Sequence, residues 1–200
     1  MIFRYADVPH ARRHGPQGYQ DYRSYKPWLR DEFHFRCVYC LCRERWFPDG
    51  DDNFSIDHVR PRGTALAQRD LYENLVYACW QCNASKQDVI GILDPCEEPF
   101  GRHVEVLEDG TIQGHTPRGV ILIRICRLDR PKLTTFRRGM LALWRTLELR
   151  QDPEAEVLRH RFFGLPANLP SLSVLRPPGG NTRPHGMSGS MCILAKPRRR

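Results

Sequence analysis

The stretch that decides the fold runs from Cys37 to Lys86. It reads Cys-Val-Tyr-Cys at 37–40, Ser-Ile-Asp-His-Val-Arg-Pro at 55–61 and Glu-Asn-Leu-Val-Tyr-Ala-Cys-Trp-Gln-Cys-Asn-Ala-Ser-Lys at 73–86. Four thiols in two closely spaced pairs suit one tetrahedral Zn²⁺, because each pair supplies two sulfurs from one tight turn. The predicted ligands of a structural zinc are Cys37, Cys40, Cys79 and Cys82.

A competing thiol lies just after the first pair. Cys42 follows Cys40 by two residues, but the spacing of Cys40 from Cys37 equals that of the second pair, so we prefer Cys40. Disulfides are the other use of paired cysteines in exported proteins. Residues 1–13 lack the long apolar segment of a signal peptide, which favours metal over disulfides and predicts a reducing, cytoplasmic location.

The middle of the stretch holds a second group of polar residues that the zinc does not need. Asp57 and His58 end an apolar run, and Asn74 and Asn83 follow them. Successive residues of a helix point about 100° apart, since one turn takes about 3.6 residues. On a helix beginning near Cys79, Cys82 can therefore face the zinc while Asn83 faces a separate site.

This arrangement resembles the HNH endonuclease family, in the subgroup whose ββα-metal motif is held by a four-cysteine zinc. The pattern of that family reads Cys-x-x-Cys, Asp/His-His-apolar-x-Pro, Asn-Leu and Cys-x-x-Cys-Asn-x-x-Lys. The match covers about a quarter of the chain. Many members carry a Gly pair soon after the Pro, whereas this chain has only Gly63, so the connecting loop is expected to differ. The matching positions are Cys37, Cys40, Asp57, His58, Val59, Pro61, Asn74, Leu75, Cys79, Cys82, Asn83 and Lys86.

The resemblance implies a role for each residue of the second group. His58 would be the general base, and an unperturbed imidazole pKa of roughly 6.5 suits that task. Asp57 and Asn83 would bind one catalytic divalent cation, because hard oxygen donors suit Mg²⁺ or Mn²⁺. Asn74 would tie the loop together and help to hold the base.

Three cations of the stretch are expected to contact phosphate groups. Lys86 belongs to the family pattern and, three residues after Asn83, shares its helix face. Arg60 and Arg62 flank the Pro and are candidates by charge and position alone. An ordinary solvated surface charge is the alternative for both arginines.

The composition favours a nucleic-acid partner. The 200 residues include 31 Lys and Arg against 23 Asp and Glu, which gives a net charge of +8. Such a balance suits nucleic acid first, with DNA before RNA, and an acidic membrane surface second. A merely soluble basic surface would show the same balance. No apolar run approaches the roughly 20 residues that span a bilayer, so no membrane segment is expected.

The expected fold class is α+β, one domain with appendages. Strands at 53–58 and 75–78 and a helix from 79 to about 89 form the centre. A short helix is expected at 28–36, a hairpin turning at Asp109-Gly110, and a helix capped by Thr116, although the β-branched residues after Thr116 would also permit a strand. Long helices follow at 130–150 and 153–163. The predicted parts are a basic arm at 1–28, the HNH nuclease domain at 29–95, a hairpin and helical extension at 96–164, and a disordered basic tail at 165–200.

Three functions are compatible with these residues. The first is a metal-dependent HNH endonuclease that hydrolyses DNA phosphodiester bonds, with restriction or anti-phage defence among the roles that the resemblance implies. The second is a zinc-stabilised nucleic-acid-binding module without catalysis, which leaves the spacing of Asp57, His58 and Asn83 unexplained. The third is a redox-sensitive or zinc-sensing protein that works through its cysteines.

Overall fold

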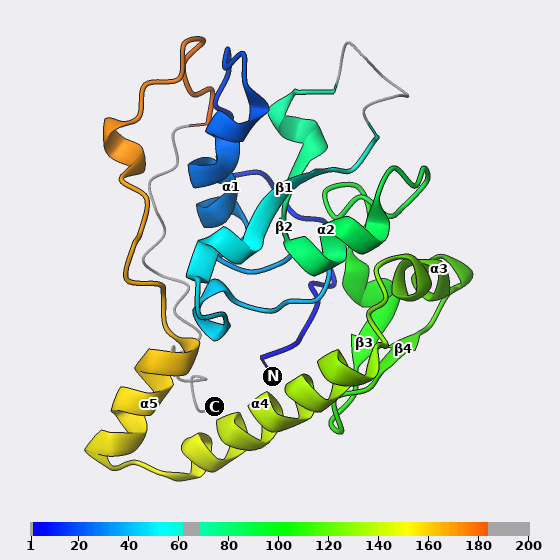
Figure 1. Cartoon of the computed structure of the whole chain (residues 1–200), viewed down its shortest axis with the longest axis vertical. Coiled ribbons are helices and arrows are strands. Elements are labelled where there is room, and N and C mark those ends of the chain that lie inside the picture. The colour runs from blue at the N-terminus through cyan, green and yellow to red at the C-terminus, as the bar shows by residue number, and fades with distance from the viewer. Residues whose placement is uncertain (1, 62–68, 184–200) are drawn as a thin grey trace.

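The computed structural model describes residues 2–61 and 69–183 (Figure 1). Within them the protein is an α+β fold of small antiparallel strand pairs and helices, as the sequence predicts. The helices and strands are α1 (Lys26–Glu32), β1 (Phe54–His58), β2 (Leu75–Cys79), α2 (Trp80–Lys86), β3 (Val104–Val106), β4 (Ile112–Gly114), α3 (Pro117–Ile125), α4 (Pro131–Leu149) and α5 (Pro153–Phe163).

The centre of the fold is a β1-β2-α2 unit. β1 pairs antiparallel with β2 from Phe54 opposite Cys79 to His58 opposite Leu75. Every residue of β2 is buried, because α1 packs against it and α2 follows it directly. The predicted strands are therefore confirmed, and they bring the end of β1 and the start of α2 to fixed places.

The expected helix at 79–89 is shorter in the structure. α2 ends at Lys86, because Gln87 takes a φ of +50°, outside the range of a right-handed helix. The amide of Gln87 still donates to the Asn83 carbonyl oxygen, which closes the last turn at 3.0 Å. This early end matters for the site, since the chain turns away just after Lys86.

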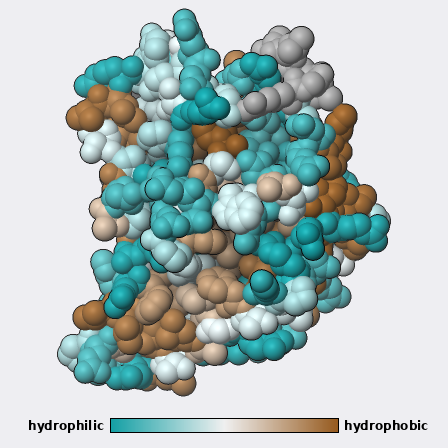
Figure 2. Space-filling view, viewed as in Figure 1, coloured by the Kyte–Doolittle hydropathy of each residue, from teal (hydrophilic) through white to brown (hydrophobic). Residues whose placement is uncertain are grey.

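The second half of the chain follows the expected order. Gly110 has a φ of +84° in the β3-β4 turn, a conformation that side chains disfavour. The hydroxyl of Thr116 accepts from the Gly119 amide and caps α3, so the helical alternative holds for this segment. Val120 and Ile121 of α3 are about half exposed. Figure 2 shows hydrophobic surface on the right of the molecule, the side where α3 lies in Figure 1.

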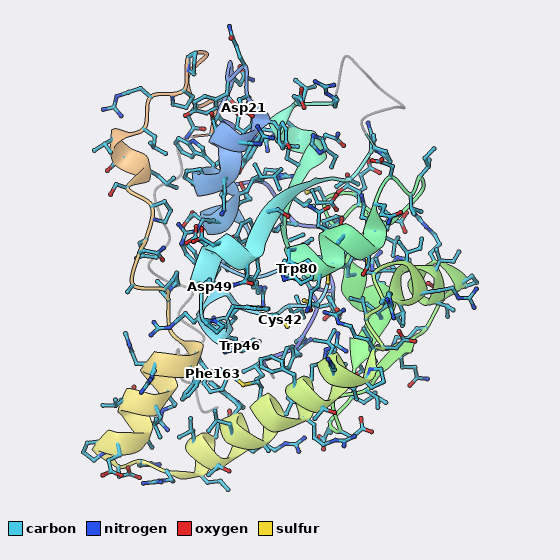
Figure 3. The ribbon with its side chains drawn as sticks, in the orientation of Figure 1. Asp21, Cys42, Trp46, Asp49, Trp80 and Phe163 are labelled. Carbon is cyan, nitrogen blue, oxygen red and sulfur yellow. The ribbon has the colours of Figure 1, made fainter. Side chains whose placement is uncertain are left out.

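Aromatic side chains join α4 and α5 to the centre of the fold. Trp46, which precedes β1, lies with its ring centroid 5.6 Å from that of Phe136 on α4 and 6.2 Å from that of Phe163 on α5 (Figure 3). Trp144 of α4 packs against Phe163 at 4.8 Å. These aromatic contacts hold the long helix α4 against the segment before β1.

The basic arm is folded into the core through one carboxylate. Glu32 of α1 is fully buried and accepts hydrogen bonds from the His10 ring, the amides of Arg13 and His14, and the Tyr72 hydroxyl. Burial alone would raise the pKa of Glu32, but the bonds from His10 and Arg13 lower it to about 2. The basic arm is therefore fixed to the fold by this carboxylate.

Two arginines of the arm also hold it against the rest of the fold. Arg12 donates to the carbonyl oxygens of Glu73 and Leu75 and lies over the rings of Phe33 and Tyr72. Arg13 pairs with Asp31. The structure thus engages both arginines in contacts within the protein.

The first part of the expected disordered tail follows a defined path. The amide of Gln17 donates to the Gly180 carbonyl oxygen, and the Asn168 side chain accepts from Arg30 and donates to Asp51. In Figure 1 this segment runs from α5 back beside α1. The expectation of disorder is wrong for residues 165–183, because these polar contacts hold a segment that lacks hydrophobic periodicity. Residues 184–200 lie outside the described part of the chain.

His34 predicts a pH dependence of stability. Its pKa is lowered to about 4, first by burial and then by the positive charges of Arg13 and Arg36. The unfolded chain takes up this proton near pH 6.5, so the stability that the neutral ring preserves is present above pH 6.5 and is lost as the pH falls toward 4.

The variant His34→Asn tests this pH dependence of the unfolding free energy against the wild type. Asparagine does not titrate and tolerates the φ of +54° at this position. Between pH 7.5 and 5.5 we expect the wild type to lose about 1 kcal/mol more unfolding free energy than the variant. Urea unfolding at both pH values with excess zinc measures the difference, and equal losses would contradict the assignment.

Candidate active site and metal centre

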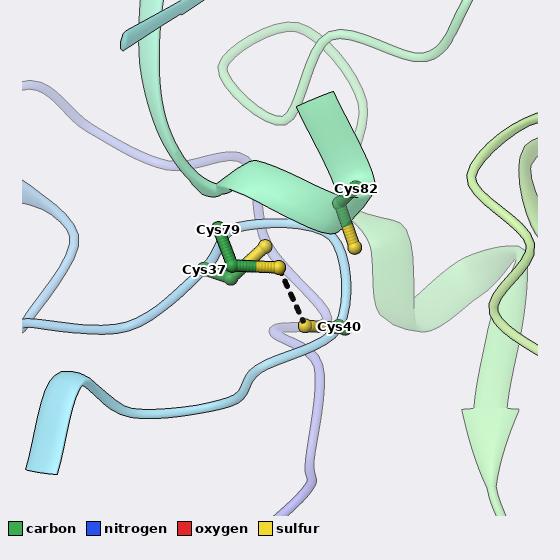
Figure 4. Close-up of side chains that lie close together, drawn as sticks. All are labelled: Cys37, Cys40, Cys79 and Cys82. Atoms are coloured by element: carbon green, nitrogen blue, oxygen red, sulfur yellow. Dashed lines mark hydrogen bonds between the residues drawn. The ribbon is translucent and has the colours of Figure 1, made fainter. Parts of the chain in front are cut away.

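The four predicted zinc ligands form one cluster. The sulfur atoms of Cys37, Cys40, Cys79 and Cys82 all lie within 4.8 Å of one another and all four residues are fully buried (Figure 4). The Sγ atoms of Cys40 and Cys79 are 3.7 Å apart. A tetrahedral zinc with Zn–S bonds of about 2.3 Å needs sulfurs about 3.8 Å apart, so the cluster fits a structural zinc.

Backbone hydrogen bonds shape the first cysteine turn. The amide of Cys37 donates to the Cys42 carbonyl oxygen, and the amide of Leu41 donates to the Cys37 carbonyl oxygen. The amide of Val38 donates to the Tyr77 carbonyl oxygen, which ties the turn to β2. Cys42 is buried but lies outside the four-sulfur cluster, so the preference for Cys40 is confirmed.

Two arginines bring positive charge near the cysteines, Arg130 close to Cys82 and Arg137 close to Cys42. Arg137 of α4 is fully buried and donates to the Leu128 carbonyl oxygen, while its Nε and Nη2 have no hydrogen-bond partner among residues 2–61 and 69–183. Burial alone would lower the pKa of Arg130, but its interactions with the thiols of Cys82, Cys40 and Cys79 raise it. The positive charge of Arg130 suits thiolates around one Zn²⁺, and that of Arg137 lies near the Cys42 thiol, an arrangement that only the tertiary fold brings about.

A cleft of about 510 Å³ lies on another face of α2. Asp57 and His58 come to it from β1, and Asn83 comes from α2, so three of the four residues predicted to form the catalytic set line one opening, and Asn74 does not. The remaining lining residues come from 22–26, from β1 and from the end of α2. They are Tyr22, Arg23, Lys26, Phe54, Ser55, Ile56, Gln87 and Asp88.

His58 lies at the last position of β1 and at the wall of the cleft. Its Nε2 is 3.4 Å from an oxygen of Asp70, and the Tyr22 ring meets the imidazole edge-on at 4.9 Å between centroids. A hydrogen bond from Arg69 holds the pKa of Asp70 below its usual value, so this carboxylate stays ionised beside the imidazole. Asp70 and Tyr22 were missed by sequence reasoning, because neither belongs to the family pattern.

Asn83 is oriented by β1. Its Nδ2 donates to the Ser55 hydroxyl at 2.8 Å and to the Ile56 carbonyl oxygen at 3.3 Å. The amide is planar, so its oxygen is turned away from these two acceptors. Such an oxygen is a hard donor of the kind that Mg²⁺ and Mn²⁺ accept.

Asp57 lies deeper than His58. Successive residues of a strand point to opposite faces, and the Asp57 carboxylate accepts from the Lys86 ammonium at 3.1 Å and from the Tyr39 hydroxyl at 2.5 Å. Burial raises the pKa of Asp57 despite both partners. Each oxygen already holds one hydrogen bond, so the predicted role of Asp57 as a cation ligand stays a prediction.

The predicted phosphate contact of Lys86 is wrong. Lys86 is fully buried, and its ammonium donates to Asp57 and, at 2.7 Å, to the carbonyl oxygen of His58. Helix phase placed Lys86 on the face of Asn83, but the buried carboxylate of Asp57 draws the flexible side chain inward. Lys86 therefore fixes the end of β1, where His58 begins to leave the sheet.

Replacing Lys86 by methionine is expected to destabilise the fold by about 3–5 kcal/mol, because it leaves a buried carboxylate without its counter-ion. Urea unfolding measures the change, and Lys132→Met, at an exposed lysine, is the matched control with an expected change within about 0.5 kcal/mol. Adding Asp57→Asn to Lys86→Met should recover part of the loss. Equal stability of the two lysine variants would contradict the buried pair.

Asn74 closes the loop that follows β1. Its side-chain oxygen accepts from the Arg60 amide at 2.8 Å, and its nitrogen donates to the carbonyl oxygens of Arg60 at 3.0 Å and Arg69 at 3.1 Å. Arg60 itself is exposed and pairs with Glu97. Arg62 lies outside the described residues. Asn74 thus joins both ends of the connecting loop next to His58, the kind of contact that the resemblance implies.

These features define a class: a ββα unit with a four-cysteine cluster on one side of its helix and a polar cleft on another. Residues 37–88, about a quarter of the chain, match the model of the HNH endonuclease family. Members of that family are generally endonucleases. The search of curated proteins found no match. Among the described residues, no helix combines the length and the apolar character that crossing a membrane requires.

Proposed function

We propose that the protein is a metal-dependent endonuclease that hydrolyses phosphodiester bonds in DNA. The observation that carries this proposal is the cleft, where His58 from β1 and Asn83 from α2 meet beside the buried four-cysteine cluster. Arg23 and Lys26 also line the cleft, and their charges suit the phosphates of a nucleic-acid backbone.

Within this proposal each side chain has a distinct task. His58 takes the proton from the attacking water, and the ionised Asp70 orients the imidazole and stabilises its charged form. Asn74 and Lys86 hold the chain on both sides of His58. The Asn83 oxygen, with Asp57 behind it, is the predicted seat of Mg²⁺ or Mn²⁺. A cation bound there would stabilise the negative charge of the scissile phosphate and of the leaving oxygen.

The experiment that tests this proposal is nicking of supercoiled plasmid with Mg²⁺ or Mn²⁺ added and with neither present. We expect strand cleavage only with added cation, and Asn83→Ala should raise the Mg²⁺ concentration that gives half-maximal nicking by about tenfold or more. Asn53→Ala, which removes an amide outside the cleft, is the control. Cleavage that needs no added cation, or an unchanged Mg²⁺ requirement in Asn83→Ala, would contradict the cation seat.

A second candidate function is a zinc-stabilised module that binds nucleic acid without cutting it. The engagement of the Asp57 carboxylate by Lys86 and Tyr39 favours it, because a catalytic cation then has fewer donors. Binding of DNA that is unaffected by chelation of Mg²⁺, with no strand cleavage under any cation, would select this alternative.

The cellular role that we propose is cleavage of foreign DNA in the cytoplasm, as in restriction or anti-phage defence. The four reduced thiols fit a reducing compartment. Plating of phages on cells that carry the wild type or His58→Ala tests this role: equal plating on both would contradict it.

A further inference from the structure

A second and larger groove lies between α2 and the start of α4, with a volume of about 830 Å³. We call it the Trp80 groove. In Figure 3 Trp80, Cys42 and Trp46 lie in the space between these two helices. The volume is within the range of sites that hold small organic molecules. Its lining residues are Cys42, Trp46, Phe47, Trp80, Gln81, Ala84, Ser85, Gln87, Arg127, Arg130, Pro131, Lys132, Leu133 and Phe136.

The groove presents an aromatic surface that the protein core does not cover. Trp80, at the first position of α2, is 53% exposed, although an indole of this size is usually buried. Trp46 forms the facing wall, and its position is fixed because its ring nitrogen donates to the Phe162 carbonyl oxygen at 2.7 Å. An exposed indole on a zinc-held turn is a rigid platform on which a flat ring can stack.

The same groove carries positive charge. Arg127, Arg130 and Lys132 line it, and no carboxylate belongs to the lining formed by residues 2–61 and 69–183. Arg130 is held in place, since it donates to the Gln81 side chain and to the Arg127 carbonyl oxygen. Cations beside an aromatic platform match the two parts of a nucleotide, its phosphate and its base.

The groove and the catalytic cleft meet at Gln87. This residue lines both, because the chain turns there at the end of α2. Asn83 faces the cleft, whereas Gln81 and Ala84 face the groove, so the two sites lie on different sides of one helix. α2 has seven residues and is therefore only about 10 Å long. A nucleic-acid strand that leaves the cleft can pass Gln87 and reach Trp80 within a few nucleotides.

We infer that the Trp80 groove binds unpaired nucleotides of the substrate, with a base stacked on Trp80 and phosphates beside Arg130 and Lys132. A base inside a duplex is covered on both faces by its neighbours, so stacking on an indole requires a single-stranded segment. The inference rests on the proposed nuclease function and names its substrate class. The preferred substrate is DNA with a single-stranded stretch next to the cut site, such as a flap, gap or overhang, rather than uniform duplex.

Binding measurements on the full-length protein test this inference without any cleavage step. Fluorescence anisotropy in buffer without Mg²⁺ or Mn²⁺ compares a blunt duplex with the same duplex carrying a single-stranded overhang. We expect the wild type to bind the overhang probe about tenfold more tightly, the range that one base–aromatic stack supplies. The wild type should also show quenched indole emission with the overhang probe.

Variants at Trp80 separate stacking from plain apolar contact. Trp80→Phe should keep most of the preference for the overhang, whereas Trp80→Leu should remove it and leave blunt-duplex binding unchanged. Lys132→Gln should weaken overhang binding, and Arg124→Gln is the matched control, because Arg124 is exposed on α3 outside the groove. Zinc content, measured for each variant, shows that the neighbouring Cys79 still holds its metal.

The outcomes separate the two proposals. An equal affinity of the wild type for both probes, or a Trp80→Leu variant that keeps the preference, overturns the role of the groove. Either result can occur in a protein that nicks plasmid normally. Overhang preference that depends on Trp80 supports the groove even where nicking is absent, because the binding assay uses no catalytic cation.

Discussion

Replacing His58 by alanine is expected to lower the nicking rate by a factor of about 10²–10⁴, the usual contribution of a general base. The structure gives the reason: the imidazole lies at the wall of the cleft that Asn83 also lines, beside the Asp70 carboxylate. The side chain lies outside the four-sulfur cluster, so zinc content should stay at the wild-type level.

Plasmid nicking with saturating Mg²⁺ or Mn²⁺ measures the rate, and zinc analysis with thermal unfolding reports on the fold. His58→Gln is a second variant that fills the space better, because the ring is buried against Tyr22. His115→Ala removes an exposed imidazole that pairs with Glu105 and should change neither readout. Wild-type nicking by both His58 variants would show that another group activates the water.

Replacing Cys79 by serine is expected to remove the zinc and unfold the centre of the protein. A structural zinc in a small domain contributes an apparent binding free energy of about 10–16 kcal/mol, which is larger than the stability of most domains. Cys79 ends β2 and immediately precedes α2, so its loss releases both elements from the first cysteine turn.

Zinc analysis, circular dichroism and limited proteolysis measure this effect. Cys96→Ser is the matched control, since Cys96 is a free cysteine outside the cluster. The contrast between Cys79→Ser and His58→Ala tests the division between a scaffold metal and a working site. Retention of stoichiometric zinc and native structure by Cys79→Ser would show that three sulfurs suffice, and loss of zinc by both variants would contradict the division itself.

The centre of the fold was predictable because covalent spacing determines it. Two Cys-x-x-Cys turns must meet at one metal, and the short runs that end at His58 and Cys79 predict two strands, which pair in the structure. The placement of Asn83 on a different side of α2 from Cys82 follows from the helical period. For these residues the sequence pattern is enough to predict the relative positions of the side chains.

The burial of two charged side chains was not predictable from the sequence pattern. Lys86 and Arg137 both stand where a helix pattern indicates an exposed face, yet both are fully buried. Lys86 is drawn inward by the Asp57 carboxylate, which only the tertiary fold brings near, and Arg137 donates to the Leu128 carbonyl oxygen and lies near the Cys42 thiol. The anchoring of the arm could not be read from the sequence either, because Glu32 and its partners are far apart in the chain.

The carboxylate of Glu32 also determines whether the family-matching segment, residues 37–88, can fold outside this protein. The Tyr72 hydroxyl inside the segment depends on Glu32, and Arg12 covers the edge formed by Glu73 and Leu75. If residues 37–88 were moved alone into another polypeptide, they would keep their four zinc ligands. The apolar strand β2 would then be exposed, and the Tyr72 hydroxyl would lose its hydrogen-bond acceptor. The sequence motif of residues 37–88 can therefore recur in other proteins, but it does not fold as an independent unit. A protein that carries it needs a helix in the place of α1 and a carboxylate in the place of Glu32.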